Sequence, residues 1–170
     1  SGEIYLDSTK IDEANLQSYQ SKISAIFADF YLFSQTLSRD GFASQSDIEE
    51  LLVLLEIDKK VSVVDNKLST TQLSTGQRKR LSLLIAILER RSILILDEWA
   101  DDQDPLFKRK FYKEILPFLQ SKGISIIAVS HDYNYFDVAT RIILVKDGFV
   151  RELDESERAS AAKDAVEKIK

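Results

Sequence analysis

The sequence contains no cysteine, no methionine, one histidine, two prolines and five glycines. Without cysteine, disulfides and thiolate metal sites are excluded, which is compatible with a reducing compartment. No segment approaches the roughly 18 consecutive apolar residues that a membrane-spanning helix needs. Because methionine is absent, the sequence does not begin at a natural start codon, and we expect it to be a piece of a longer protein.

The five glycines are isolated from one another, at positions 2, 41, 76, 123 and 148. The phosphate-binding loop G-x-x-x-x-G-K-[ST] therefore does not occur in the sequence. The net charge of −5 argues against a nucleic-acid partner, because phosphate contacts need clustered Lys and Arg. We expect no nucleic-acid partner and no complete P-loop site within these residues.

The composition is that of one globular domain, since 44% of the 170 residues are hydrophobic and 30% are charged. A helix is expected over residues 47–55, with Ser46 or Asp47 as its N-terminal cap. The remaining pattern of the first half predicts strands at 3–7 and 22–28, a short helix within 11–20, and a hairpin at 61–69.

The second half alternates apolar strands with helices. Asp104 is placed to cap a helix that begins at Pro105, Pro117 is expected to kink it, and Gly123 to end it. Two apolar strands joined by a helix form a βαβ unit, so we predict an α/β fold whose mainly parallel sheet is covered on both faces. The elements expected here are a helix at 76–90, a strand at 92–96, a helix at 105–122, a strand at 124–129, a hairpin at 141–153 and a polar helix at 154–170.

The start of the helix at 76–90 is the first candidate site. A helix N-terminus offers unpaired N–H groups and a partial positive charge, and a glycine allows a phosphate to approach the backbone closely. An ordinary serine-capped helix explains the same residues equally well. The candidate phosphate-contacting residues are Leu73, Ser74, Thr75, Gly76 and Gln77.

Two further candidates follow neighbouring apolar strands. Asp97 and Glu98 end one strand, at the rim where parallel sheets bind ligands. Asp97 can hold Mg2+ through water, and Glu98 can polarise an attacking water. His131 follows the next strand and can contact a phosphate and orient that water. Each feature alone is common in structural roles, but all three in order on adjacent rims of one sheet favour a phosphate-processing site.

These residues carry a family resemblance. Residues 73–77 resemble the signature motif of ABC transporter ATP-binding domains, and residues 93–98 resemble the Walker B strand with its catalytic glutamate. Asp104 resembles the D-loop aspartate of the family. Residues 130–132, Ser-His-Asp, resemble its H-loop. The resemblance extends over nearly the whole chain.

Residues 97–105, together with the segments at 30–33, 68–71 and 157–166, resemble one branch of this family. That branch comprises bacterial exporters of cyclic peptides and peptide siderophores, of the syringomycin, pyoverdine and microcin type. The fold implied is a partial P-loop NTPase (RecA-like) core plus the ABC α-helical subdomain. Its implied divisions are core strands and Q-loop region (1–33), helical subdomain with the signature (34–90), Walker B, D-loop and H-loop core (91–153) and C-terminal helix (154–170).

The resemblance also implies how the intact protein works. ATP and Mg2+ would be its cofactors, with Glu98 and His131 catalytic, Asp97 at the metal and Asp104 communicating across a dimer. Its partners would be a second ATP-binding domain, paired head to tail, and a membrane permease domain fused upstream. The implied location is the cytoplasmic face of the inner membrane.

The sequence departs from the family pattern in several places. The Walker A loop would lie upstream of Ser1, so we expect this chain alone to be inactive. Ala28 stands where the Q-loop glutamine is usual; Asp29 either substitutes for it or belongs to a solvated loop. Thr75 replaces a commoner glycine. We expect Asp101 and Asp102 to be solvated, Trp99 to be a packing residue, and the aromatics at 30–33 to contact a membrane domain or belong to the core.

Two other functions are compatible with the same motifs. One is a soluble ABC protein acting on DNA or ribosomes, although such proteins usually carry a coiled-coil insertion or basic stretches. The other is a non-catalytic domain that binds nucleotide only to dimerise. Retention of Glu98 and His131 argues against this second alternative.

Overall fold

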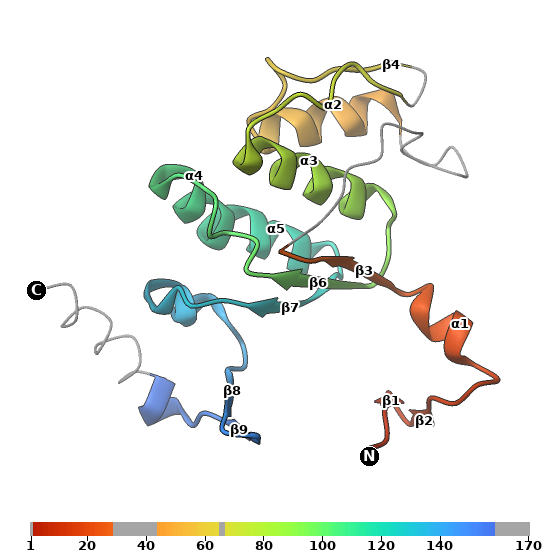
Figure 1. Cartoon of the computed structure of the whole chain (residues 1–170), viewed down its shortest axis with the longest axis vertical. Helices are drawn as coiled ribbons and strands as arrows, with labels where there is room; N and C mark the ends of the chain where they lie inside the picture. The colour runs from red at the N-terminus through yellow and green to blue at the C-terminus, as the bar shows by residue number, and fades with distance from the viewer. Residues whose placement is uncertain (1, 29–43, 65–66, 159–170) are drawn as a thin grey trace, which may run out of the picture.

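A three-stranded parallel sheet lies at the centre of the protein, with strand order β3–β6–β7 (Figure 1). Its strands are Ile23–Ile26, Ile93–Asp97 and Ser125–Val129. The computed structural model describes residues 2–28, 44–64 and 67–158. Within the sheet, Ala25 pairs with Ile95 and Ile95 with Ile127, so the strand ends lie level with one another. The α/β class, the parallel sheet and the βαβ unit predicted from the apolar runs are confirmed.

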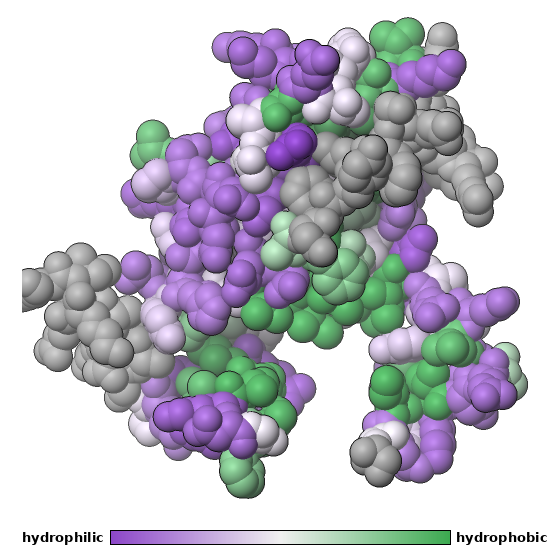
Figure 2. Space-filling view, viewed as in Figure 1, coloured by the Kyte–Doolittle hydropathy of each residue, from purple (hydrophilic) through white to green (hydrophobic). Residues whose placement is uncertain are grey.

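Helices cover one face of this sheet in the described part of the chain (Figure 1). Helix α3 (Thr75–Leu88) leads into β6. The inward residues of β6, Leu94 and Leu96, are buried because they face the helical layer. The prediction of cover on both faces is wrong for these residues: alternation along β7 turns Ile127 and Val129 to the other face, where both are exposed. Figure 2 shows apolar surface over this part of the sheet.

A helical unit packs above α3 and away from the sheet (Figure 1). Helix α2 (Gln45–Leu54) and the antiparallel pair β4 (Val63–Val64) and β5 (Lys67–Leu68) form it. The expected cap at Ser46 or Asp47 is wrong, because Ser44 caps α2. The Ser44 hydroxyl accepts from the Asp47 N–H at 3.0 Å, and the Asp47 carboxylate accepts from the Ser44 N–H at 3.2 Å. This reciprocal pair needs the acid at the third helical position, which sets the helix start.

The segment between β6 and β7 is one helical run of three parts. They are α4 (Pro105–Lys110), the π-helical η1 (Phe111–Ile115) and α5 (Leu116–Ser121). Asp104 caps α4 as predicted, and Gly123, with φ of 81°, follows its end. The irregularity expected at Pro117 takes the form of the preceding π turn. Pro117 has no N–H to donate, so a regular α-helical ladder cannot pass through it.

Smaller elements lie at both ends of the described chain. The antiparallel pair β1 (Tyr5–Leu6) and β2 (Thr9–Lys10) and helix α1 (Leu16–Gln20) precede β3, and the 3-10 helix η2 (Tyr133–Val138) follows β7. Strands β8 (Ile143–Lys146) and β9 (Phe149–Glu152) form the predicted hairpin. Its turn residues Asp147 and Gly148 have φ of 51° and 80°, the left-handed values of a tight hairpin turn.

Candidate functional site

Glu98 and His131 meet at the carboxyl ends of adjacent parallel strands. Asp97 ends β6 opposite Val129 of β7, and the Glu98 N–H donates to the Val129 carbonyl at 3.0 Å. The His131 Nε2 atom lies 3.0 Å from Glu98 Oε1. The side chains are 72% and 39% exposed, so both groups are open to a ligand. The structure therefore joins the two residues that the sequence placed on neighbouring rims.

The geometry fixes the hydrogen bond between these side chains. An ionised carboxylate can only accept, so Nε2 of His131 carries the hydrogen when Glu98 is ionised. The second oxygen of Glu98 then remains as an acceptor for water. Glu98 also has φ of 48°, an uncommon backbone angle for a residue with a long side chain. Such angles concentrate at functional sites and persist where surrounding contacts enforce them.

Asp97 is the candidate metal residue at this rim and is partly buried. Residues 2–28, 44–64 and 67–158 contain no group of three His, Cys, Asp or Glu side chains that could hold a metal ion. A single carboxylate suits Mg2+, which is usually bound through one or two carboxylates, several waters and substrate phosphates. The donor set around Asp97 therefore fits a metal that arrives with a phosphate ligand.

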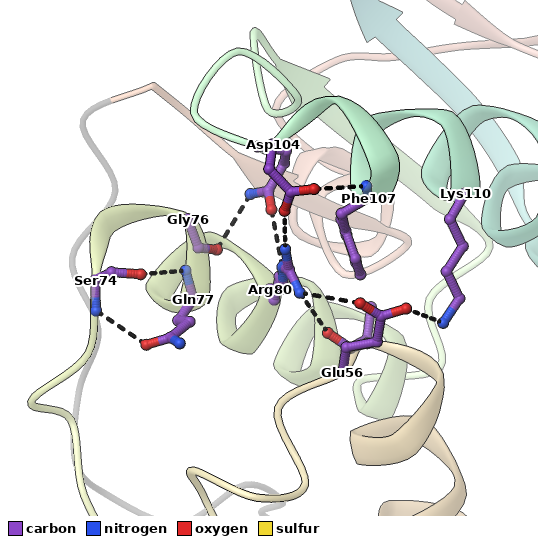
Figure 3. Close-up of polar contacts among 10 residues, drawn as sticks. Glu56, Ser74, Gly76, Gln77, Arg80, Asp104, Phe107 and Lys110 are labelled. Carbon is purple, nitrogen blue, oxygen red and sulfur yellow. Dashed lines mark hydrogen bonds and ion pairs between the residues drawn. The ribbon is translucent and has the colours of Figure 1, made fainter.

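The second candidate region is the N-terminus of α3 (Figure 3). The Ser74 hydroxyl accepts from the Gln77 N–H at 3.3 Å, and the Gln77 side chain accepts from the Ser74 N–H at 3.2 Å. A hydroxyl both donates and accepts, so Ser74 retains one hydrogen for an anion. Ser74 and Thr75 are exposed, Gly76 and Gln77 are partly buried, and Leu73 packs against the core.

The segment between Glu98 and Asp104 lies against α3 (Figure 3). The Arg80 guanidinium donates to Gln103 Oε1 and to Asp104 Oδ2, both at 2.9 Å. Gln103 in turn donates to the Gly76 carbonyl at 3.1 Å. Arg80 also lies 3.4 Å from the ring centroid of Phe107. Sequence reasoning assigned no role to Arg80 or Gln103, because their contacts join positions more than 20 residues apart.

Asp104 is held by two kinds of contact. Its Oδ1 atom accepts from the Phe107 N–H at 3.0 Å, as a helix cap does. This backbone hydrogen bond, and then the charge of Arg80, hold the pKa of Asp104 below its ordinary value. The carboxylate is therefore charged at neutral pH and fixed to α3 rather than directed at Glu98.

A hydrogen-bonded group supports the segment that carries His131. The Tyr112 hydroxyl lies 2.7 Å from Ser130 Oγ and donates to Asp132 Oδ2 at 3.2 Å. Lys108 donates to Asp132 from the preceding helical turn at 3.1 Å. Burial raises the pKa of Tyr112 well above its usual value, so its phenol keeps its proton. Tyr112 and Lys108 thus hold Ser130 and Asp132, the residues on either side of His131.

Gly76 has no room for a side chain. A Cβ atom there would lie 2.8 Å from the backbone oxygen of Asp102, a contact that requires the backbone to move. We expect Gly76→Ala to lower the free energy of unfolding by about 1–3 kcal/mol, the usual cost of overpacking. The matched control is Thr75→Ala at an exposed position, where thermal denaturation should show almost no change. Equal melting temperatures for the two variants would contradict the close packing of α3 on residues 98–104.

Two predictions concern residues beyond the described ranges. Asp29, the candidate substitute in the Q-loop, lies outside them, as do the aromatics at 30–33. Their predicted roles stay predictions. Asp101 and Asp102, by contrast, are described, and both are exposed as expected; Asp102 in addition forms an ion pair with the buried Lys79 at 2.8 Å. Trp99 is buried at 2% exposure, as expected of a packing residue.

Comparison with known proteins identifies the family. The family model described as ABC transporter matches residues 1–101, more than half of the chain. The chain belongs to the ABC transporter family. The match covers the signature motif and the end of β6, which were the main residues of the resemblance. The family predicted from the sequence is thereby confirmed.

Curated relatives in this ABC transporter family extend over most of the chain. The ATP-binding protein SyrD of Pseudomonas syringae pv. syringae is 41% identical over 152 residues, which are 88% of this chain and 27% of SyrD. The ATP-dependent lipid A-core flippase of Vibrio vulnificus is 27% identical over 89% of this chain and 28% of the flippase. The chain thus spans little more than a quarter of the length of these relatives. The likeness to SyrD agrees with the branch expected from the sequence.

Solved structures share the fold. CbiO1 from Clostridium perfringens, part of the ABC transporter complex CbiONQ, superimposes with a TM-score of 0.71 at 23% identity, over 99% of this chain and 72% of CbiO1. The ATP-binding cassette MJ0796, in a dimeric post-hydrolysis state with ADP and Pi, gives 0.68 at 24% identity, over 91% and 73%. The expected ABC-type core is confirmed. Among the described residues, no helix is long and apolar enough to cross a membrane.

Proposed function

We propose that this chain is part of the ATP-hydrolysing domain of an ABC exporter. The observation that carries the proposal is the 3.0 Å contact between His131 Nε2 and Glu98 Oε1 at the end of two adjacent parallel strands. General bases act through groups within hydrogen-bond reach of the proton that they accept. Glu98 is partly exposed, oriented by His131, and attached to a rim where α/β sheets bind ligands.

Each residue has a distinct part in the proposed reaction. Glu98 accepts a proton from water at the oxygen that His131 does not contact. Without nucleotide, the Nε2 hydrogen of His131 orients this carboxylate; with nucleotide bound, the same N–H would donate to a phosphate oxygen instead. Asp97 fits Mg2+ through water, and the metal supplies charge neutralisation on the phosphates. Asp104 holds the segment after Glu98 against α3, where a neighbouring subunit would sense it.

The signature residues fit the nucleotide of a partner domain. The N-terminus of α3, a helix of 14 residues, presents backbone N–H groups and the Ser74 hydroxyl to solvent. In this chain, the Ser74 side chain bonds to Gln77, whereas the Glu98 side chain bonds to His131. This separation supports a head-to-tail dimer, in which one subunit contributes Glu98 and the other its signature. The dimeric state in the description of MJ0796 agrees with such an assembly.

The wider assembly follows from the relatives. Since SyrD and the lipid A-core flippase are much longer than this chain, we propose that the intact protein has a membrane permease domain fused upstream. The ATP-binding domain would then lie at the cytoplasmic face of the inner membrane. The proposed cargo is a cyclic peptide or a peptide siderophore, and this chain by itself is proposed to be inactive. The proposed divisions remain core (1–33 and 91–153), helical subdomain (34–90) and C-terminal helix (154–170).

Metal removal tests this function. The intact protein, reconstituted in lipid vesicles, should hydrolyse ATP with Mg2+, lose turnover in EDTA, and recover it when Mg2+ is restored. A cyclic peptide or a peptide siderophore should then accumulate on the far side of the membrane only with ATP and Mg2+. Binding of ATP without turnover would instead favour the non-catalytic alternative. Stimulation of turnover by DNA or ribosomes would favour the soluble alternative.

A further inference from the structure

Lys79 is a buried cation in the middle of the site. Its side chain is 3% exposed, and Nζ pairs with Asp102 Oδ2 at 2.8 Å and donates to the Glu98 carbonyl at 3.0 Å. Taking an ammonium out of water is costly unless it is paired and hydrogen-bonded. Here both partners come from one short segment, residues 98–102, which starts at the proposed catalytic glutamate.

The position of Lys79 on α3 explains its burial. Lys79 precedes Leu83 by one helical turn, so both lie on the face of α3 that is directed at the core. The link also runs in the opposite direction, because the Trp99 indole N–H donates to the Lys79 carbonyl at 2.9 Å. The side chain of Lys79 therefore holds the backbone of residue 98, and the side chain of residue 99 holds the backbone of Lys79.

The Glu98 backbone needs such support. Its φ of 48° is a strained conformation in residues other than glycine, and it persists only where surrounding contacts enforce it. Three contacts fix the backbone on either side of the Glu98 Cα atom: the Glu98 N–H donates to Val129 of β7, and the Glu98 carbonyl accepts from Lys79 Nζ at 3.0 Å and from the Asp101 N–H at 3.3 Å. The sheet thus holds the N–H of Glu98, and Lys79 of α3 holds its carbonyl. Without the ammonium, the Glu98 carbonyl would keep only the longer bond from the Asp101 N–H of its own turn, and among the described residues no hydrogen bond would join Glu98 to α3.

The contacts of Arg80 differ in kind. Arg80 binds Gln103 and Asp104, at the far end of the same segment, and the Asp104 side chain is 55% exposed. These bonds attach the segment to α3 but do not reach Glu98. Among the described residues, Lys79 is the cation that contacts the Glu98 backbone.

We propose that Lys79, charge-paired with Asp102, is a positioning residue that sets the backbone of Glu98 and hence the direction of its carboxylate. This inference rests on the proposed role of Glu98. Lys79 touches neither substrate nor water in this scheme and acts only through Glu98. The buried ammonium of Lys79 thereby joins α3 to Glu98, the proposed general base.

Lys79→Met in the intact protein is the decisive variant. Methionine keeps an unbranched side chain of similar length, and removing one member of an ion pair is costly for stability chiefly when the partner left behind is buried. Asp102 is 47% exposed and can be solvated after its partner is lost. We expect kcat for ATP to fall about ten- to a hundredfold, as misplaced catalytic groups do, with KM and melting temperature almost unchanged. Lys113→Met, which removes an exposed ion pair with Asp137, should leave kcat as it is.

Two further measurements separate positioning from general damage. In a protein that already carries Glu98→Gln, Lys79→Met should cause no additional loss of turnover, because both changes act through one group. The Glu98 amide should exchange its hydrogen faster in Lys79→Met than in the wild type, whether or not ATP is hydrolysed. If Lys79→Met fails to fold, Asp102→Asn, which keeps the size and removes the charge, should lower kcat in the same direction.

The outcomes are distinct for the two proposals. An active wild type with unchanged kcat in Lys79→Met would overturn the positioning role and leave the proposed function intact. A full additional loss in the Glu98→Gln background would also overturn it. An inactive wild type would contradict the proposed function, and unchanged exchange at Glu98 would then overturn the positioning role as well.

Discussion

Glu98→Gln should abolish most ATP turnover while ATP binding is retained. Glutamine has the size of glutamate and can accept a hydrogen bond, but it cannot take a proton from water. General-base catalysis contributes about 10²–10⁴-fold, so we expect kcat to fall by at least about a hundredfold. The side chain is 39% exposed, and among the described side chains its hydrogen-bond partner is His131, so folding should be unaffected. Steady-state turnover and equilibrium ATP binding by the intact protein are the measurements.

The matched control is Glu114→Gln, the same change at an exposed position of η1. It should alter neither turnover nor binding. Equal turnover by Glu98→Gln and the wild type would contradict the assignment of the base. Loss of ATP binding together with turnover would show that Glu98 acts in binding rather than in proton transfer.

The sequence predicts the Glu98–His131 pair because both residues follow apolar strands of a βαβ unit. Residues 93–96 are all Ile or Leu, and residues 126–129 are apolar throughout, so two neighbouring parallel strands are the expected result. Their carboxyl ends then lie at the same rim. The observed register, with Asp97 opposite Val129, brings the two following loops together.

The contacts between α3 and residues 98–104 could not be predicted in this way. They depend on side chains about 20 residues apart, and Asp102 alone has the properties of a solvated acid. One signal was present: Lys79 falls on the apolar face of α3, one turn before Leu83, where a lysine must be paired if it is buried. Its partner can be identified only once the fold brings residue 102 within 2.8 Å.

The start of α2 shows the limit of local signals. Ser44, Ser46 and Asp47 are all good caps, and the propensities do not separate them. The structure selects Ser44 because Asp47 can return the hydrogen bond only from the third helical position. The exposed face of the sheet is a different case. The apolar residues of β7 predict cover on both faces, whereas the helices that join these strands all lie on one side.

Trp99→Ala should be the most destabilising single substitution near the site. The Trp99 side chain is 2% exposed, and its ring centroid lies 4.3 Å from that of Phe111 and 6.4 Å from that of Phe107. Removing a buried tryptophan typically lowers the free energy of unfolding by about 3–5 kcal/mol. The loss of the bond from its indole N–H to the Lys79 carbonyl adds to the effect.

Two comparison variants divide this loss into its causes. Trp99→Phe keeps an aromatic ring against Phe111 but removes the hydrogen bond. Its free energy of unfolding should therefore lie between those of the wild type and Trp99→Ala. Leu106→Ala removes an apolar side chain that is 83% exposed, and it should change the free energy of unfolding by less than about 0.5 kcal/mol. Calorimetric unfolding of the three variants is the measurement. If Trp99→Ala unfolds at the temperature of Leu106→Ala, residues 98–104 do not pack on α3 and η1 as the structure shows. If Trp99→Ala unfolds at a much lower temperature than Leu106→Ala, the aromatic contacts of Trp99 stabilise the domain and also hold the residue next to Glu98 in place.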